Sequence, residues 1–178
     1  MKIEADARIA FPRDVAFRAY RDELPALVPH LPNVNAIEVK ETEAAPGGVA
    51  ARTRKLNVWR AKADVPTVAQ AIIKPEMLAW DDKALWDEAD WTCEWQTVPH
   101  FFTDRIKCGG KNRFVVDGDH CVLQIRGDLE VDVKGLPGVP RLLAGTVGAG
   151  IEKFVVALLT PNLTSVSKGL EAYLRGKK

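Results

Sequence analysis

The chain has 178 residues, of which 47% are hydrophobic and 28% charged, with a formal net charge of +1. This composition excludes a disordered chain, and the length suits one domain whose core needs no metal or disulfide support. The near balance of 25 basic and 24 acidic residues argues against non-specific nucleic-acid binding, which requires a surplus of Lys and Arg. We therefore expect residues 1–178 to form a single domain with no nucleic-acid partner.

The N-terminal segment alternates between apolar and charged residues. Apolar side chains recur at every second position from Ile3 to Phe11, and this period of two predicts a half-buried strand. Pro12 is suited to begin a helix, because it lacks only an N–H group that the first helical turn leaves unpaired. The prolines of segment 25–32 (PALVPHLP) mark off a second short helical piece.

The middle of the chain predicts about six strands and one small helix. Segments 34–43 and 48–59 predict a hairpin with its turn at 44–48, and residues 64–73 predict a short amphipathic helix. Two further strands are predicted at about 77–89 and 91–99. The last pair, 106–116 and 121–133, surrounds the turn signal at 117–119, and its second strand directs Leu123 and Ile125 inward.

The C-terminal segment has apolar residues at helical spacing from Leu143 onward, with Pro161 predicted to bend or interrupt the helix. Its most hydrophobic part, 142–159, contains Glu152, Lys153 and three glycines, and is therefore too polar for a membrane span. The N-terminus does not read as a signal peptide. The three cysteines form no CxxC pair and are interpreted as free thiols, so we expect a cytoplasmic protein.

This order of elements predicts an α+β fold in which a curved antiparallel sheet wraps around the long C-terminal helix, with two short helices after the first strand. The last helix is the only long apolar element that can cover the apolar face of the sheet. A curved sheet and a cylindrical helix leave space between them. The sequence therefore predicts a cavity walled by the inward-facing residues of the strands.

The chain resembles the START / Bet v 1-like superfamily, also called SRPBCC, whose fold is the helix-grip. The resemblance is carried by segments 3–20 (IEADARIAFPRDVAFRAY), 77–99 (MLAWDDKALWDEADWTCEWQTVP) and 148–174 (GAGIEKFVVALLTPNLTSVSKGLEAYL). It is strongest for bacterial members with a G-x-I-E-K start to the final helix. A fainter similarity to PRELI-like lipid-transfer proteins lies in segments 64–73 and 167–174. The resemblance implies binding or transfer of lipids, sterols, polyketides or other apolar molecules under the long helix, and some relatives are cyclases, aromatases or hydrolases.

Four of the five tryptophans lie between residues 80 and 95. Strand alternation places Trp80 and Trp86 on one face of their strand, and Trp91 and Trp95 on one face of the next. Core packing and cavity lining explain this pattern equally well. Stacking on nucleobases is disfavoured, because the acidic residues nearby would repel phosphates.

The candidate ligand-binding residues are the inward-facing aromatic and aliphatic ones: Trp80, Trp91, Trp95, Leu123, Ile125, Val147, Ile151, Phe154, Val155 and Leu158. Arg113 joins them as a group that would bind a carboxylate or phosphate if it pointed inward, with exposure to solvent as the favoured alternative. Only His100 and Glu94 qualify as weak catalytic candidates, and a surface position is the favoured reading of His100. The chain shows no metal-ligand spacing, phosphate-binding loop or G-x-S-x-G motif, so we expect no cofactor and no metal.

The favoured function is therefore that of a non-catalytic carrier or sensor for a lipid-like or other hydrophobic small molecule. Two alternatives stay open: a polyketide cyclase/aromatase- or hydrolase-like enzyme that uses the same cavity, and a protein-interaction module whose groove is filled by its own side chains. A monomer or weak dimer is expected, and transient contact with a membrane stays open. The sequence does not name the ligand.

Overall fold

The computed structural model describes residues 1–44, 52–65, 67, 70, 73–74, 77–132 and 144–177, without the side chains of 144, 147 and 159–164. The elements are β1 (Lys2–Ile9), α1 (Arg13–Asp22), the 3-10 helix η1 (Leu24–His30), β2 (Val34–Ala44), β3 (Arg52–Ala61), β4 (Ala79–Asp87), β5 (Thr92–Pro99), β6 (Ile106–Asp117), β7 (His120–Val131) and α2 (Ala144–Gly176). This order confirms the predicted α+β arrangement. The predicted turn at 44–48 falls largely outside the described residues, as does half of the predicted small helix at 64–73.

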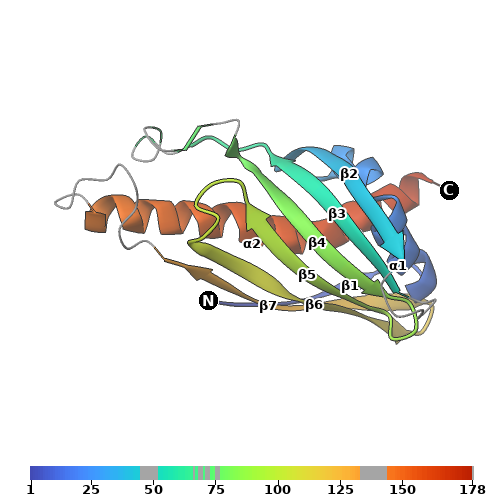
Figure 1. Ribbon diagram of the computed structural model, residues 1–178. Coiled ribbons are helices and arrows are strands. Elements are labelled where there is room, and N and C mark those ends of the chain that lie inside the picture. The colour runs from blue at the N-terminus through green and yellow to red at the C-terminus, as the bar shows by residue number, and fades with distance from the viewer. Residues whose placement is uncertain are drawn as a thin grey trace.

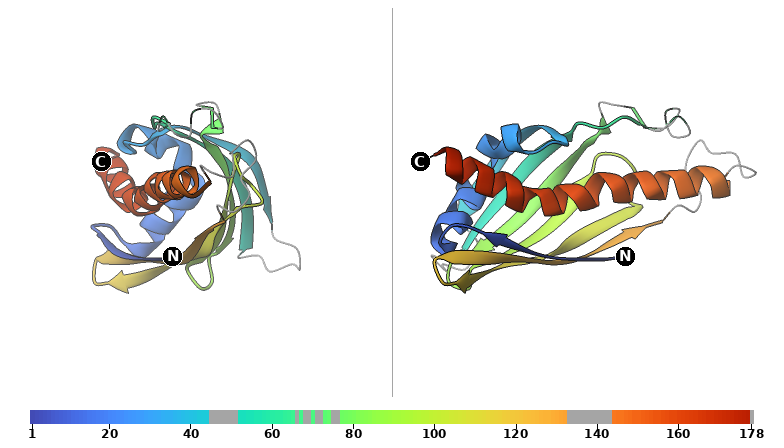
Figure 2. Two further views of the ribbon diagram at one scale, coloured as in Figure 1. Left: turned by 90° about the vertical axis from the view of Figure 1, so that its left-hand side faces the viewer. Right: turned by 180° about the vertical axis from the view of Figure 1, so that it is seen from behind.

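The strands form one antiparallel sheet in the order β1-β7-β6-β5-β4-β3-β2. Each strand after β1 pairs with the next one along the chain, and β1 pairs with the last strand, β7. The sheet curls around α2, which runs along its concave side (Figures 1 and 2). The helix-grip prediction is confirmed.

Alternation decides which residues of the edge pair β1–β7 face the helix. Ile3 and Ile9 are almost fully buried, and they pair with Gly127 and Cys121 of β7. On β7 the buried residues are Cys121, Leu123, Ile125 and Leu129, whereas Arg126 and Asp128 between them are exposed. The apolar side of both strands therefore contributes to one core beneath α2.

Helix α1 closes one end of the curled sheet. It follows Pro12 directly, as the sequence predicts. Phe17 of α1 is completely buried, and its ring makes edge-on contacts with Trp86, Trp91 and Phe114 at centroid distances of 5.2, 5.3 and 5.2 Å. These contacts fix α1 against β4 and β6.

Trp91 does not lie on the strand that the sequence assigns to it. Its φ of 56° places it in a turn, and β5 begins only at Thr92. The ring instead packs against Phe17 and lies 4.3 Å from the guanidinium carbon of Arg13. Left-handed backbone at a bulky residue is uncommon, which is why alternation alone misplaces Trp91.

Helix α2 is continuous from Ala144 to Gly176, so Pro161 does not interrupt it, and of the predicted bend or interruption only the interruption is ruled out. Losing one helical hydrogen bond at a proline is offset when both halves of a helix pack on a core. Near its C-terminal end α2 contacts η1 closely, because Gly169 has no side chain to keep Leu31 away. No helix among the described residues is both long enough and apolar enough to cross a membrane.

Candidate functional site

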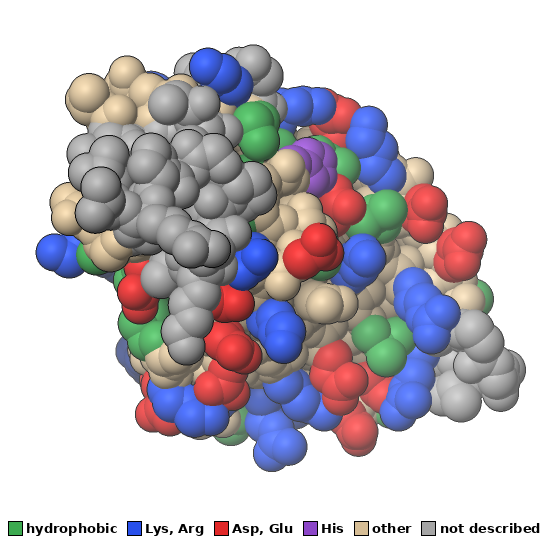
Figure 3. Space-filling view, turned by 60° about the vertical axis from the view of Figure 1, so that its left-hand side comes forward, with side chains coloured by type: hydrophobic (Ala, Val, Ile, Leu, Met, Phe, Trp, Pro, Cys, Tyr) green, Lys and Arg blue, Asp and Glu red, His purple; other side chains and the backbone are tan. Residues whose placement is uncertain are grey.

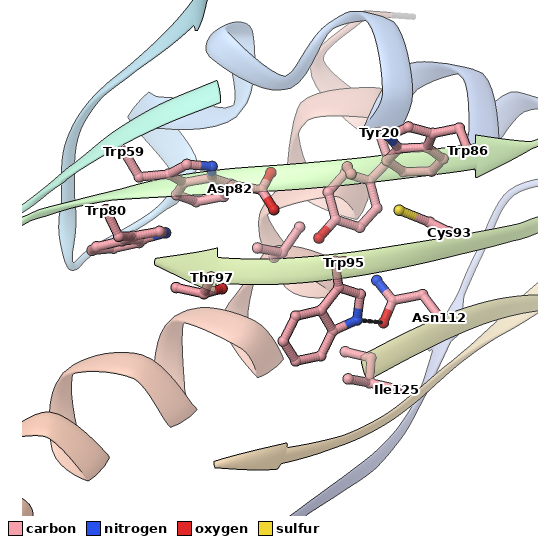
Figure 4. A pocket seen from close by; sticks show the side chains of 12 residues that line it. Tyr20, Trp59, Trp80, Asp82, Trp86, Cys93, Trp95, Thr97, Asn112 and Ile125 are labelled. Carbon is pink, nitrogen blue, oxygen red and sulfur yellow. Dashed lines mark hydrogen bonds between the residues drawn. The ribbon is translucent and has the colours of Figure 1, made fainter. Parts of the chain in front are cut away.

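A cavity of about 40 Å³ lies between the concave face of β3–β7 and helix α2. Four indoles form most of its wall: Trp59 from β3, Trp80 and Trp86 from β4, and Trp95 from β5 (Figure 4). The rings of Trp59 and Trp80 stack with a centroid distance of 5.7 Å and an interplanar angle of 20°. Aliphatic side chains of Ala84 and Ile125, and Val166 of α2, complete the apolar part of the wall.

One indole is held by a buried hydrogen bond. Trp95 donates its Nε1–H to Oδ1 of Asn112 on β6, over 2.9 Å. Asn112 also lines the cavity and is buried. The Nε1 atoms of Trp59 and Trp86 are buried too, but they have no hydrogen-bond partner within the described part of the chain. The indole N–H groups of Trp59 and Trp86 are therefore hydrogen-bond donors without an acceptor among the described residues.

Asp82 brings a carboxylate to the cavity. It lies on β4 between Trp80 and Ala84, and its Oδ2 accepts a hydrogen bond of 3.1 Å from Nδ2 of Asn57. Burial raises the pKa of Asp82 from 3.8 to about 6, because the charged form is poorly solvated there. Asn57 and the nearby Trp59 indole oppose this rise, although the Trp59 N–H does not reach hydrogen-bond geometry.

Two further titratable groups face the same space, Tyr20 from α1 and Cys93 from β5. Burial and the charge of Asp82 raise the pKa of both the Tyr20 phenol and the Cys93 thiol well above their ordinary values. Both groups are therefore neutral near pH 7. Among the described lining residues, Asp82 is the only group that carries a charge at that pH.

The small volume of the cavity limits what it holds as it stands. About 10–15 Å³ is needed for one water molecule, whereas pockets for drug-sized ligands span about 300–1,000 Å³. A cavity of about 40 Å³ therefore holds a few waters or a compact chemical group. The predicted hollow is present, but it is smaller and more polar than the sequence leads us to expect.

The structure brings together only some of the predicted ligand-binding residues. Trp80, Trp95 and Ile125 line the cavity. Leu123, Ile151, Phe154, Val155 and Leu158 are buried in the surrounding core but are not part of the lining. Trp91 packs on α1 outside the cavity, and the side chain of Val147 lies outside the described residues.

Arg113 does not point inward. It is exposed on the convex face, whereas its neighbours Asn112 and Phe114 are buried. The register of the β6–β7 hairpin explains this, because Asn112 pairs with inward-facing Ile125 and Arg113 pairs with Gln124. Paired residues share a face of the sheet, so Arg113 is turned away from the cavity.

The two catalytic candidates also lie outside the cavity. The side chain of His100 is 40% exposed, and its Nε2 lies 2.7 Å from Oδ1 of Asp81. Glu94 is 59% exposed and forms a surface ion pair of 3.1 Å with Lys111. Neither group is placed to act on a ligand beneath α2.

The cysteines and acidic residues offer no further site. All three cysteines are free and buried, and burial raises the pKa values of Cys108 and Cys121 to about 11. Their thiols are therefore protonated and unreactive at neutral pH. Among the described residues, no group of three or more His, Cys, Asp or Glu side chains is placed to hold a metal ion.

Sequence reasoning did not assign Tyr20, Asp82 or Asn112, three of the polar residues that line the cavity, to a site. A signal for Asp82 was present, because it shares strand alternation with Trp80 and Trp86. Asn112 follows from the hairpin register. No sequence signal indicates that Tyr20 of α1 reaches the same space, since this depends on how α1 packs against the sheet.

The arrangement of a curled seven-stranded sheet, α1 and η1 at one end and α2 across the concave side recurs in solved structures. A protein from Thermus thermophilus superposes with a TM-score of 0.65 at 22% identity, covering 100% of this chain and 99% of that one. The Zhui aromatase/cyclase from Streptomyces sp. R1128 superposes with a TM-score of 0.64 at 16% identity, with coverage of 100% and 96%. A START superfamily protein from Mycobacterium smegmatis gives 0.52 at 14% identity, with 99% of each chain covered.

The chain has the START / Bet v 1-like helix-grip fold. The resemblance seen in the sequence is thereby confirmed for the fold. No protein-family model matches the chain, and no curated protein is significantly similar to it in sequence. Identities of 22% and below establish shared architecture and do not transfer an activity.

Proposed function

We propose that the protein binds a compact hydrophobic molecule in the cavity between the sheet and α2, as a non-catalytic carrier or sensor. The observation that carries this proposal is a cavity walled by four indoles, with a few polar groups facing into it. Ligand pockets combine apolar walls with a few orienting polar groups in this way. Affinity would arise mainly from apolar area removed from water, at roughly 25 cal/mol per Å², less the cost of ordering the ligand.

The size of the cavity selects among hydrophobic ligands. A long acyl chain or a sterol needs far more room than about 40 Å³. Carriage or transfer of a lipid in this space would therefore require α2 to move away from the sheet. A compact molecule that occupies the space beside Trp80 and Trp95 requires less movement, and we favour it.

Native mass spectrometry after gentle purification, followed by titration with graded apolar compounds from benzene to fatty acids, phospholipids and sterols, tests the proposal. We expect compact compounds to bind and Ala84→Leu, which fills the cavity from β4, to weaken that binding by at least tenfold. Ala149→Leu makes the same change at an exposed position of α2 and serves as the matched control. Absence of a retained molecule, together with no binding across the panel, contradicts the proposal.

A second candidate is catalysis in the same cavity, favoured by one observation. Asp82, with a pKa of about 6, faces the same space as the hydroxyl of Tyr20 (Figure 4). A carboxyl group that titrates near neutral pH is suited to general acid–base chemistry. For this candidate, Asp82→Asn should abolish turnover of a cyclisable polyketide mimic while its binding persists. Turnover that is unchanged in Asp82→Asn rules out this role.

The protein-interaction alternative gains no support from the described surface. The exposed large apolar side chains of the described residues are Met1, Val15 of α1, Val39 of β2, and Val115 and Val116, which are neighbours on β6. On the face shown in Figure 3, hydrophobic side chains stand singly among Lys, Arg, Asp and Glu. Isolated apolar residues of this kind are ordinary on a soluble protein surface.

A further inference from the structure

The cavity contains a carboxylate without a counter-ion. Oδ2 of Asp82 accepts from Asn57, whereas Oδ1 has no hydrogen-bond partner among the described residues. The lining that the structure describes includes no Lys, Arg or His side chain. Asp82 is half-buried and lines the cavity, and a carboxylate withdrawn from bulk water is costly unless a cation or several donors compensate it. Its Oδ1 therefore marks a place where a ligand would be stabilised.

The groups around Asp82 suit a positively charged partner. The hydroxyl oxygens of Tyr20 and Thr97 face the cavity and can accept hydrogen bonds. The indoles of Trp59 and Trp80 lie across Asp82 from Tyr20 (Figure 4), and aromatic faces attract cations and the methylene groups attached to them. An anion in this place would instead meet the carboxylate at close range.

We propose that the cavity binds the protonated amino group of a compact apolar amine and excludes carboxylates and phosphates of similar shape. This inference rests on the proposed binding function and specifies its ligand class. The ammonium group donates to Oδ1 of Asp82 and to the hydroxyl of Tyr20 or Thr97. The apolar remainder of the ligand contacts the indoles and Val166 of α2.

The site then has a characteristic pH dependence. The groups that face Asp82 are Asn57 and Trp59 of β3, Tyr20 of α1 and Cys93 of β5, and all of them are neutral near pH 7. The described lining residue from α2, Val166, is apolar. Protonation of Asp82, whose pKa is about 6, therefore competes directly with the ammonium, and amine affinity falls as the pH drops below 6.

An isosteric series tests charge selection directly: tert-butylammonium, tert-butanol and pivalate, titrated into 15N-labelled protein at pH 7.5. The indole N–H signals of Trp59, Trp86 and Trp95 report binding, because all three rings line the cavity. We expect tert-butylammonium to bind at least tenfold more tightly than tert-butanol and pivalate to leave the signals unchanged. At pH 5, we expect the affinity for the ammonium to fall about tenfold, whereas that for the alcohol stays constant.

Asp82→Asn keeps the shape of the side chain and an acceptor for Asn57, but it removes the charge. The variant should bind the ammonium no more tightly than the alcohol. Asp81→Asn makes the same change one residue earlier, on the outer face where Asp81 contacts His100, and should retain the preference. If Asp82→Asn fails to fold, the pH 5 titration of the unaltered protein makes the same comparison.

The outcomes separate the two proposals. Equal or tighter binding of the alcohol, or binding of pivalate, overturns charge selection and leaves the hydrophobic-ligand proposal intact. Charge selection is also overturned if none of the three compounds shifts the indole signals while neutral apolar compounds still bind. If neutral compounds also leave every indole signal unchanged, both proposals fail.

Discussion

The indole ring of Trp95 lies directly against Gly127. A Cβ atom added at Gly127 would stand 2.9 Å from two ring carbons of Trp95 and 2.7 Å from the carbonyl oxygen of Gly109. Gly110, which pairs with Gly127 across β6 and β7, is equally confined, since its Cβ would stand 2.2 Å from the carbonyl oxygen of Arg126. These two glycines allow Trp95 to lie flat on the sheet, where its Nε1 reaches Asn112.

Gly127→Ala should therefore displace Trp95 and lower the free energy of unfolding by about 1–3 kcal/mol, as overpacking of a core does. Chemical denaturation monitored by tryptophan fluorescence measures this change. Gly145→Ala is the control, because a Cβ there meets nothing within 4 Å and alanine favours the helix. A Gly127→Ala protein as stable as the parent would show that Trp95 is not held in this position.

The order of elements was sufficient to predict the fold. One alternating strand, two short helices, a run of antiparallel strands and one long apolar helix leave few ways to cover the sheet. Individual orientations were harder to predict. Trp91 lies in a left-handed turn that alternation does not reveal. For Arg113 the sequence leaves two orientations open with exposure favoured, and the hairpin register, which turns it outward, agrees with the favoured one.

Only Trp80, Trp95 and Ile125 of the described apolar lining were among the predicted ligand-binding residues, whereas Trp59, Trp86 and Val166 were not. Trp80 and Trp95 follow from strand alternation, because their neighbours fix the inward face. Asp82 was counted with the acidic residues around it, although it shares a face with Trp80. A charged residue on an apolar face conflicts with burial rules, and such conflicts occur at functional sites. Tyr20 depends on tertiary packing, which no local pattern encodes.

Asp82 should make the stability of the fold depend on pH in a direction opposite to that of a salt-bridged carboxylate. Its folded-state pKa of about 6 exceeds the usual 3.8, so between these values the native state binds more protons than the unfolded state. The contribution of this group to the free energy of unfolding therefore decreases as the pH rises from about 4 to 6. Asp82→Asn removes that loss, and its stability relative to the parent should rise by up to about 3 kcal/mol over this range.

Urea denaturation of both proteins at a series of pH values from about 4.5 to 8 measures the difference between their free energies of unfolding. The other carboxylates are the same in both proteins, so their contributions to the pH dependence cancel. Asp81→Asn is the matched control, since it loses only a surface contact with His100, worth less than about 1 kcal/mol. A constant difference between Asp82→Asn and the parent at every pH would show that Asp82 is not buried as a charge.

The hydrogen bond from Trp95 to Asn112 should couple the two residues energetically. Asn112→Leu leaves the Trp95 N–H buried without an acceptor, which costs about 1–3 kcal/mol. Trp95→Phe removes the donor, so in that background Asn112→Leu should cost much less. A double-mutant cycle by chemical denaturation measures this coupling, and strictly additive effects would contradict it.

The contact between Gly169 of α2 and Leu31 should determine how closely the helix approaches η1. A Cβ at Gly169 would stand 2.6 Å from Cδ2 of Leu31 and 3.2 Å from the carbonyl oxygen of His30. Gly169→Ala should therefore destabilise the fold by about 1 kcal/mol, even though alanine favours the helix by a similar amount. Leu31→Ala removes the clashing atom, so Gly169→Ala should cost less in that background.

Because Val166 lines the cavity one turn away, Gly169→Ala should also shift the indole N–H signals of the lining tryptophans, whereas Gly145→Ala should not. Unchanged signals in Gly169→Ala would show that the Leu31 side chain absorbs the added methyl group without movement of α2.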